Sequence, residues 1–185
     1  DIGCGRGEFL ELLKDFDIEA TGVDSYDVFV EYCKMNGLKA VNHDAIEYIS
    51  ELEGNIGGIF AGQIVEHLNI NQIVDLCNLA YEKLSEGSYL VIETPNPTSL
   101  AIYTNAFYID PSHIKPVHPL TLKYLLEKAG FEHVEIKFIA ESAININIPA
   151  IDIDQIKNSQ EINDYFNLIG ELLFGSQDYA IIAKK

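Results

Sequence analysis

The run Asp1-Ile2-Gly3-Cys4-Gly5-Arg6-Gly7 is the part of the chain from which its architecture can be inferred. Its pattern is that of the end of a buried strand, a glycine-rich turn and the start of a helix. Glycines at alternate positions let the backbone take positive φ values and pass close to a ligand, because glycine has no Cβ. A dinucleotide-binding turn has the spacing G-x-G-x-x-G, whereas this run is G-x-G-x-G. The run therefore indicates a ligand-binding turn of another kind, with a tight turn that binds nothing as the alternative.

The size and composition of the chain limit what it can be. A length of 185 residues suits a single domain, 1–185, with its own hydrophobic core. Hydrophobic residues make up 48% and charged residues 22%, which is typical of a globular protein. No apolar run reaches the roughly 18 residues of a membrane span, and no signal-peptide pattern is present.

The charge and the cysteine content limit which partners the protein can bind and indicate its cellular compartment. Twelve basic and 29 acidic residues give a net charge of -17, which repels phosphate backbones and argues against a nucleic-acid substrate. The three cysteines, Cys4, Cys33 and Cys77, are widely spaced and lack metal-ligand spacing. We therefore expect buried, reduced thiols in a cytoplasmic protein. Nothing in the sequence indicates the oligomeric state.

Strand-like and helix-like segments alternate along the chain. After the first strand, apolar runs predict strands over 18–23, 38–41, 56–61, 89–93, 131–138 and 179–183. Helical periodicity predicts helices over 7–14, 26–35, 44–52, 71–84, 118–129 and 161–174. This alternation predicts an α/β fold, a Rossmann-like doubly wound and mostly parallel sheet of seven strands with helices on both faces.

Three parts of the chain fall outside that regular pattern. The chain begins at the end of the first strand without an initiator Met, so we expect a truncated first strand and a missing N-terminus. Residues 95–117 form a long aromatic insertion, and loops of that length are usually functional or disordered. A second insertion covers 140–176, in which the Ile/Asn/Asp alternation of 140–158 predicts an extended or poorly ordered segment.

Motifs with acidic or polar residues follow four successive predicted strands. They are the glycine run 1–7, Asp24 in TGVD, Asp44 in NHDAIEYI, and QIVEHL at 63–68. Open α/β sheets bind ligands at this end of their strands. Together the four motifs resemble the class I S-adenosylmethionine-dependent methyltransferases, and the resemblance covers nearly the whole chain. It implies methyl transfer with S-adenosyl-L-methionine as cofactor, and an antiparallel last strand beside the fifth.

Three further segments are similar to one branch of that superfamily. They are ETPNPTSL at 93–100, FYIDPSHIKPVHPLTLKYLLEKAGF at 107–131, and SQDYAIIAKK at 176–185. The branch contains bacterial and archaeal methyltransferases associated with surface-glycan or lipopolysaccharide synthesis. The resemblance therefore implies a small-molecule or glycan acceptor and O-methylation.

The resemblance assigns the glycine turn to the methionine part of the cofactor, through Gly3, Gly5 and Gly7. Asp1 would lie near the cofactor's amino group, and its alternative role is that of a capping or chain-end residue. Each of these residues is therefore a candidate cofactor contact with a structural alternative.

Four further residues would complete the cofactor site. Asp24 would accept hydrogen bonds from the ribose hydroxyls, with an N-cap as its alternative role. Asp44 would accept from the adenine amino group and the Ala45 N–H would meet a ring nitrogen; capping can coexist with that role. Gln63 would line the methionine pocket or satisfy a backbone group at the strand end.

The pair Glu66-His67 suggests catalysis. An alcohol nucleophile must lose its proton, and histidine suits that task near neutral pH. His67 is thus a candidate base, with a structural role at least as well supported, and His113 is a second candidate. Tyr108, Asp110 and His118 are candidate acceptor contacts, although His118 can equally begin a helix. No spacing of His, Cys and carboxylates indicates a metal site, so we expect metal-independent chemistry.

Two other functions remain open at this point. A nicotinamide-dependent oxidoreductase shares the α/β pattern, but the glycine spacing counts against it. A non-catalytic S-adenosylmethionine-binding module would keep the cofactor residues without turning over any acceptor. Titration with NAD separates the first alternative, and an assay of turnover separates the second.

Overall fold

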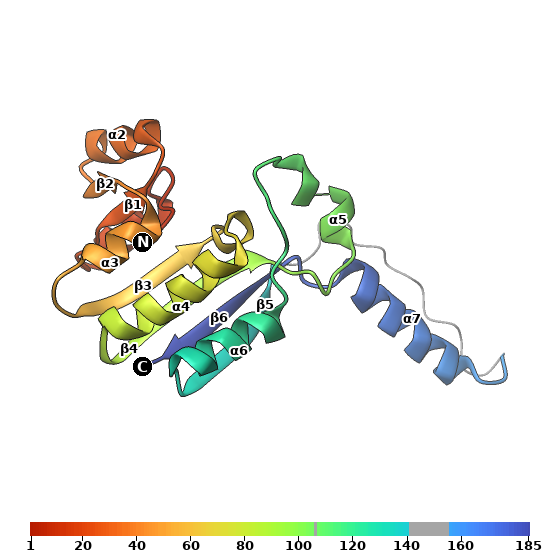
Figure 1. The fold of residues 1–185 in the computed structure, drawn as a ribbon. Helices are drawn as coiled ribbons and strands as arrows, with labels where there is room; N and C mark the ends of the chain where they lie inside the picture. The colour runs from red at the N-terminus through yellow and green to blue at the C-terminus, as the bar shows by residue number, and fades with distance from the viewer. Residues whose placement is uncertain (106, 141–155) are drawn as a thin grey trace.

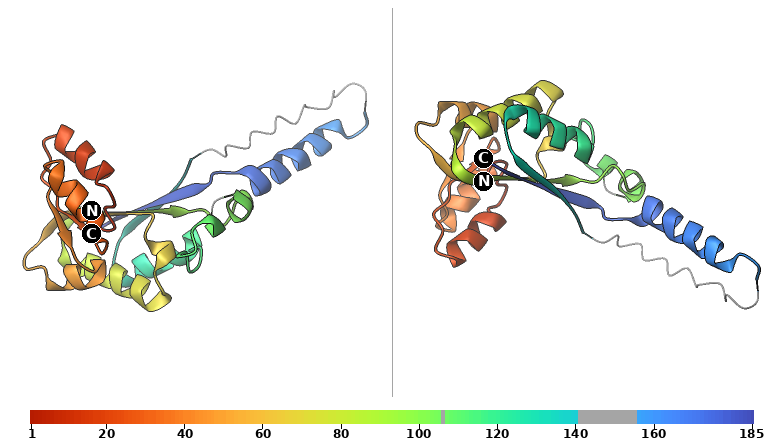
Figure 2. Two further views of the ribbon diagram at one scale, coloured as in Figure 1. Left: turned by 90° about the horizontal axis from the view of Figure 1, so that it is seen from above. Right: turned by 90° about the horizontal axis from the view of Figure 1, so that it is seen from below.

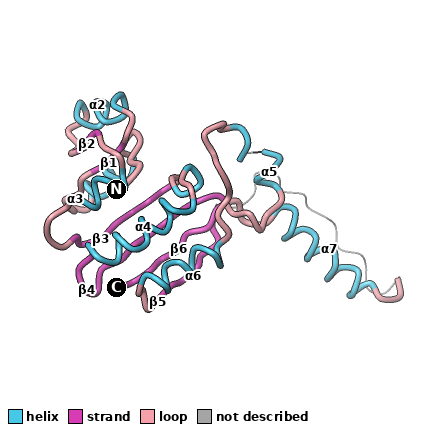
Figure 3. The backbone as a smooth tube through the Cα atoms, viewed as in Figure 1, coloured by secondary structure: helices cyan, strands magenta, loops and turns pink. Residues whose placement is uncertain are grey.

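The computed structural model describes residues 1–105, 107–140 and 156–185 (Figure 1). Its strands are β1 (Gly22–Asp24), β2 (Ala40–Asn42), β3 (Ile56–Gly62), β4 (Leu84–Pro95), β5 (His133–Ile139) and β6 (Asp178–Lys184). Its helices are α1 (Glu8–Asp15), α2 (Asp27–Met35), α3 (Ala45–Glu51), α4 (Ile70–Lys83), α5 (Ala101–Asn105), α6 (Pro119–Ala129) and α7 (Ser159–Phe174). Two 3-10 turns, η1 (Val65–His67) and η2 (Phe107–Ile109), complete the elements, which Figure 3 colours by type.

The strands form two groups joined through Ile2. Strands β1 and β2 are parallel, and the other group has the order β3-β4-β6-β5. Ile2 makes isolated parallel bridges to Val23 of β1 and to Ala61 of β3. The described residues thus form six strands instead of the seven expected, and a bridge occupies the place of the first.

The last strand runs antiparallel to both of its neighbours. Strand β6 pairs with β4 from Tyr89↔Lys184 to Pro95↔Asp178, and with β5 along its whole length. Strands β3 and β4 are parallel. The sheet is therefore mixed, and the expected position of the antiparallel strand beside the predicted fifth strand is what the structure has.

Helices α4 and α6 pack on one face of the larger group of strands, and α1 contacts the other face at β3. Leu90 and Ile92 of β4 are fully buried in one core with residues of α4 and α6, which lie side by side over the sheet in Figure 1. On the opposite side of β3, Phe60 stacks on Phe9 of α1 with ring centroids 4.1 Å apart. The period-2 alternation of β3 thus sends side chains to both layers.

A second, smaller core lies beneath the glycine turn. It is formed by Cys4, Leu10, Val30, Cys33, Leu38 and Ala40. A Cβ on Gly7 would come within 2.7 Å of Leu38 Cδ1 and 2.9 Å of Cys33 Sγ. The turn therefore packs directly on its own core, and the thiols of Cys4 and Cys33 fill space there.

The two predicted insertions differ in how much of them is structured. The segment 95–117 contains α5 and η2, which a pattern without clear periodicity did not predict. Residues 141–155, expected to be extended or poorly ordered, lie outside the described residues. Helix α7 follows and projects away from the sheet (Figure 2). Within the described ranges, no helix has both the length and the apolar character that crossing a membrane requires.

Candidate active site

The predicted cofactor residues gather where the parallel strands end. Asp24 is the last residue of β1, and Gly62 is the last residue of β3. Ile2 lies between these strands, because its N–H donates to Phe60 O at 2.9 Å and its neighbour Gly3 donates to Val23 O at 2.8 Å. The glycine turn therefore emerges between the ends of β1 and β3, where open α/β sheets bind ligands.

The backbone of the turn is one that glycine favours. Gly3, Gly5 and Gly7 have φ values of 69°, 53° and 87°, and an L-residue pays a steric cost in that region. A Cβ on Gly3 would lie 3.0 Å from Ile64 Cδ1. The turn is thus packed against the segment that follows β3.

Asp24 holds the turn in place with its carboxylate. Oδ2 accepts a hydrogen bond from the Gly5 N–H at 2.9 Å, and Oδ1 accepts from the Tyr26 N–H at 2.8 Å. The N-cap of α2 is Tyr26, so Asp24 is not the cap residue. A carboxylate has about four acceptor positions. Two positions on the half-buried Asp24 are therefore left for a ligand.

The next two positions along this edge serve local structure. Asp44 is the N-cap of α3, where Oδ1 accepts from Ile46 N at 2.9 Å and from Glu47 N at 3.0 Å. Ala45 is the first residue of that helix. The capping role that the sequence predicts for Asp44 is thus present, and the residue is exposed. Asp1 contributes its carbonyl, which accepts from Val23 N at 2.8 Å.

Gln63 connects the ends of three strands. Its backbone has φ 51° and its N–H donates to Glu93 O at 2.8 Å. Its side-chain amide donates to Glu93 Oε1 at 3.4 Å and to Asp178 Oδ1 at 3.3 Å. Burial raises the pKa of the Asp178 carboxyl. Sequence reasoning missed both carboxylates, since they come from β4 and β6, far away in the chain.

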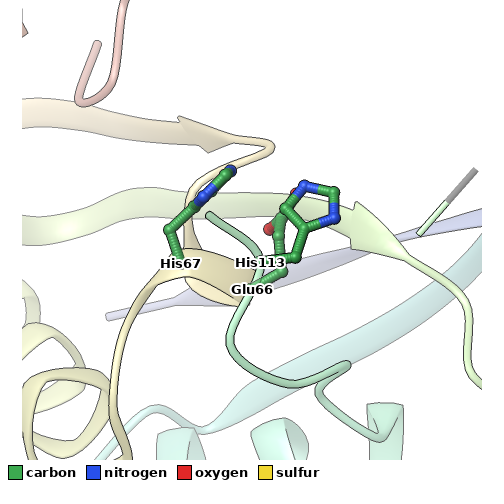
Figure 4. A group of neighbouring side chains, drawn as sticks. All are labelled: Glu66, His67 and His113. Atoms are coloured by element: carbon green, nitrogen blue, oxygen red, sulfur yellow. The ribbon is translucent and has the colours of Figure 1, made fainter. Parts of the chain in front are cut away.

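The structure brings Glu66, His67 and His113 together (Figure 4). One ligand atom of each lies within 4.8 Å of the others, and the two imidazole centroids are 4.6 Å apart. The 113–115 segment is fixed to η1, because the Ile114 N–H donates to the Glu66 carbonyl at 2.8 Å. His67 and His113, the two residues that the sequence suggests as catalytic, thus lie in one site together with Glu66.

Hydrogen bonds indicate which tautomer each of the two neutral imidazoles adopts. Ser112 Oγ donates to Asp110 Oδ1 at 2.6 Å, and this hydroxyl has only one proton. The His67 Nδ1, 3.0 Å from Ser112 Oγ, must therefore donate to it. His113 Nδ1 lies 2.6 Å from the Phe107 carbonyl, which only accepts. Nε2 of each neutral ring consequently bears a lone pair.

The remaining acceptor-side candidates have different surroundings. Tyr108 is exposed, with its ring 5.4 Å from that of Phe107. Asp110 is exposed, and hydrogen bonds from Ser112 lower the pKa of its carboxyl. His118 is the N-cap of α6, where Nδ1 accepts from Leu120 N at 3.2 Å. The structure therefore joins Asp110 to the histidine pair, and gives His118 the helix-start position that was its alternative role.

Cys4 is not a nucleophile in this site. Burial raises the pKa of its thiol to about 12, so the thiolate is scarce at neutral pH. The side chain is packed in the smaller core. This agrees with the packing role expected from the sequence.

The chain is similar to known methyltransferases. A methyltransferase domain family matches residues 1–136. A SAM-dependent methyltransferase from Archaeoglobus fulgidus is 45% identical with a TM-score of 0.93, over 100% of this chain and 84% of that one. No curated protein sequence matches the chain.

More distant structures share the fold. One is a methyltransferase from Thermotoga maritima described as a possible histamine N-methyltransferase, with 15% identity and a TM-score of 0.63 over 100% of this chain and 79% of that chain. Another is the plantazolicin methyltransferase BamL, solved with a substrate analogue and SAH, with 20% identity and a TM-score of 0.63 over 100% and 75%.

The chain belongs to the methyltransferase domain family. It is an S-adenosylmethionine-dependent methyltransferase, and both the enzyme class and the cofactor expected from the sequence are confirmed. The oxidoreductase alternative is thereby set aside.

Proposed function

We propose that this chain transfers the methyl group of S-adenosylmethionine to a hydroxyl oxygen of a small molecule or glycan. The observation that carries the proposal is the 2.9 Å hydrogen bond from the Gly5 N–H to Asp24 Oδ2, which fixes an acceptor-rich carboxylate beside the glycine turn. The cofactor would contact Asp1, Gly3, Gly5, Gly7, Asp24, Asp44, Ala45 and Gln63.

The acceptor side of the site is proposed to lie at the histidine pair. A lone pair on Nε2 of His67 can take the proton of an attacking hydroxyl, and general-base help of this kind typically contributes ~10²–10⁴-fold. His113 is next to it, and Tyr108, Asp110 and His118 belong to the same stretch of chain. Surface-glycan precursors are the first acceptors to test, because the segments 93–100, 107–131 and 176–185 resemble methyltransferases of that kind.

The function is tested by binding and turnover on the same preparation. Calorimetry with S-adenosylhomocysteine measures cofactor binding, and labelled S-adenosylmethionine measures methyl transfer to sugars, phenols and amines. Methyl transfer to hydroxyl compounds supports O-methylation, whereas transfer to amines alone overturns it. Binding without turnover on any acceptor favours the non-catalytic module instead.

Replacing Asp24 tests its place in the cofactor site. We expect Asp24→Ala to weaken S-adenosylhomocysteine binding by about 1–3 kcal/mol, since charge-assisted hydrogen bonds are lost. Asp27→Ala, at an exposed position at the start of α2, is the matched control and should bind as the wild type does. An unchanged affinity of Asp24→Ala in a folded chain would remove Asp24 from the cofactor site.

A further inference from the structure

The site contains a carboxylate oxygen with an unusual environment. Glu66 is 0% exposed, and its Oε2 accepts a hydrogen bond from Thr94 Oγ1 at 2.9 Å. In the described parts of the chain, no donor reaches the buried Oε1. A buried polar atom without a partner costs about 1–3 kcal/mol, and more when it is charged. Oε1 of Glu66 is therefore open to a further partner.

The two neighbouring histidines also have lone pairs that are available to a partner of Glu66. Nδ1 of His113 donates to the Phe107 carbonyl, and Nδ1 of His67 donates to Ser112, which in turn donates to Asp110. Metal-binding histidines almost always donate the other ring N–H to a carbonyl, a carboxylate or a comparable group. The outer hydrogen bonds of a metal site are thus in place around both rings.

The distances fit one ion. The three ligand atoms lie within 4.8 Å of one another. Bonds of about 2.0–2.2 Å from zinc to imidazole nitrogen and carboxylate oxygen place ligand atoms of a tetrahedral ion about 3.3–3.6 Å apart. Separations of at most 4.8 Å therefore need to shorten by no more than about 1.5 Å for the three residues to share one ion.

We propose that Glu66, His67 and His113 bind one divalent transition-metal ion, such as Zn²⁺, with the remaining coordination positions open. The two imidazoles favour zinc, iron or nickel over magnesium and calcium, which prefer all-oxygen sites. The chain spacing did not indicate this site, because the loop that follows η2 carries His113 to η1 only in the folded chain.

The ion would lie beside the proposed cofactor turn. Gly3 packs on Ile64, which is two residues before Glu66. A bound ion also occupies the Nε2 lone pair that His67 needs as a base. The metal content of the chain therefore decides which of these two roles His67 has, and it can be measured without any methyl acceptor.

The test is a Zn²⁺ titration of the chelator-treated chain by calorimetry, with metal analysis of the untreated chain. We expect one Zn²⁺ per chain, and at least a tenfold weaker affinity for Glu66→Gln and for His113→Ala. The control is His133→Ala, an exposed histidine on β5, which should retain the wild-type affinity. Ser112→Ala should weaken binding by about tenfold, since it removes only an outer hydrogen bond.

Co²⁺ gives an independent readout of the same site. We expect visible absorption bands in the wild type that are absent in His113→Ala, with circular dichroism confirming that the variant is folded. If Glu66→Gln does not fold, His113→Ala and Ser112→Ala decide the matter. Absence of saturable Zn²⁺ binding to the wild type, or equal affinity in His113→Ala, would overturn the metal site. Either result leaves S-adenosylhomocysteine binding, and with it the proposed function, to be judged separately.

Discussion

At the scale of single residues, Glu66 combines full burial with an oxygen that no donor in the described residues reaches. Burial raises the pKa of its carboxyl, and the hydrogen bond from Thr94 and the nearby His67 and His113 offset only part of that effect. The folded protein therefore binds the proton of Glu66 more tightly than the unfolded chain does. Stability must then depend on pH in a definite direction.

The metal-free wild type should lose stability relative to Glu66→Gln as the pH rises. Below pH 4.5, the ordinary value, the carboxyl is protonated in both states and the variants respond alike. Between that value and the raised folded-state pKa, the unfolded chain binds fewer protons than the folded one, so wild-type stability falls. Urea unfolding of both proteins across this range, with chelator present, measures the difference.

The matched control is Glu53→Gln, at an exposed position between α3 and β3. It should follow the wild type at every pH. A constant difference between Glu66→Gln and the wild type would contradict the expected titration of Glu66.

At the scale of elements, the geometry of the glycine turn depends on residues that have no side chain. Gly7 stands at the N-cap of α1 with φ 87° and ψ 23°, and no side chain caps the helix there. Both the backbone conformation and the packing against Leu38 and Cys33 exclude a Cβ. The turn, the small core and α1 are thus coupled through one position.

Gly7→Ala should destabilise the chain by about 2–5 kcal/mol. About 1–2 kcal/mol comes from the left-handed backbone, and overpacking of the core adds about 1–3 kcal/mol. Gly57→Ala is the control, because a Cβ there meets nothing within 4 Å and its φ is not positive. Thermal and urea unfolding measure both variants, and equal stabilities would show that the turn can relax around a methyl group.

The local sequence pattern predicts most of the helices and strands. Where the observed bounds differ from the predicted ones, tertiary contacts are the cause. Strand β4 was expected over 89–93 but begins at Leu84, because Leu84 pairs with Ile56 of β3 and local periodicity does not register such a pairing. Helix α5 and η2 lie in a stretch without helical periodicity. Helix α6, with His118 at its N-cap and Gly130 at its end, matches its expected bounds closely because its capping signals are local.

The residues of the site likewise fall into those that local sequence predicts and those that only tertiary contacts bring together. The grouping of the cofactor candidates at one edge was predictable, because each follows a strand and parallel strands bring their ends to one edge. The contacts of Gln63 with Glu93 and Asp178, and of Glu66 with Thr94, join distant segments. They could not be inferred from spacing, which shows only neighbours along the chain.

At the scale of the whole molecule, the charge of -17 is the dominant property. Like charges on a compact body repel one another and oppose folding. Raising the ionic strength from about 0.01 M to about 0.15 M shortens the Debye length from ~30 Å to ~8 Å. We therefore expect Tm to rise over this range in either NaCl or KCl, as differential scanning calorimetry can measure.

The same salt series near the pH at which the net charge vanishes is the control. There the repulsion is absent, so Tm should hardly respond to salt. A Tm at neutral pH that falls or stays constant as salt is added would indicate that local ion pairs outweigh the net repulsion.

The position of β6 has a consequence for how the chain acquires its shape. This strand follows every other described element in sequence, yet it lies between β4 and β5 and, among the strands of the described residues, is the only one that pairs with β5. During synthesis, residues 133–139 must therefore wait, with an unsatisfied strand edge, until residues 178–184 have emerged. A waiting edge of this kind can pair with other chains. In this half of the sheet, the last strand to be synthesised is thus the one that the preceding strand needs for pairing. A nascent chain that stalls between the two strands would expose the edge of β5, which chaperones that bind exposed strand edges would recognise.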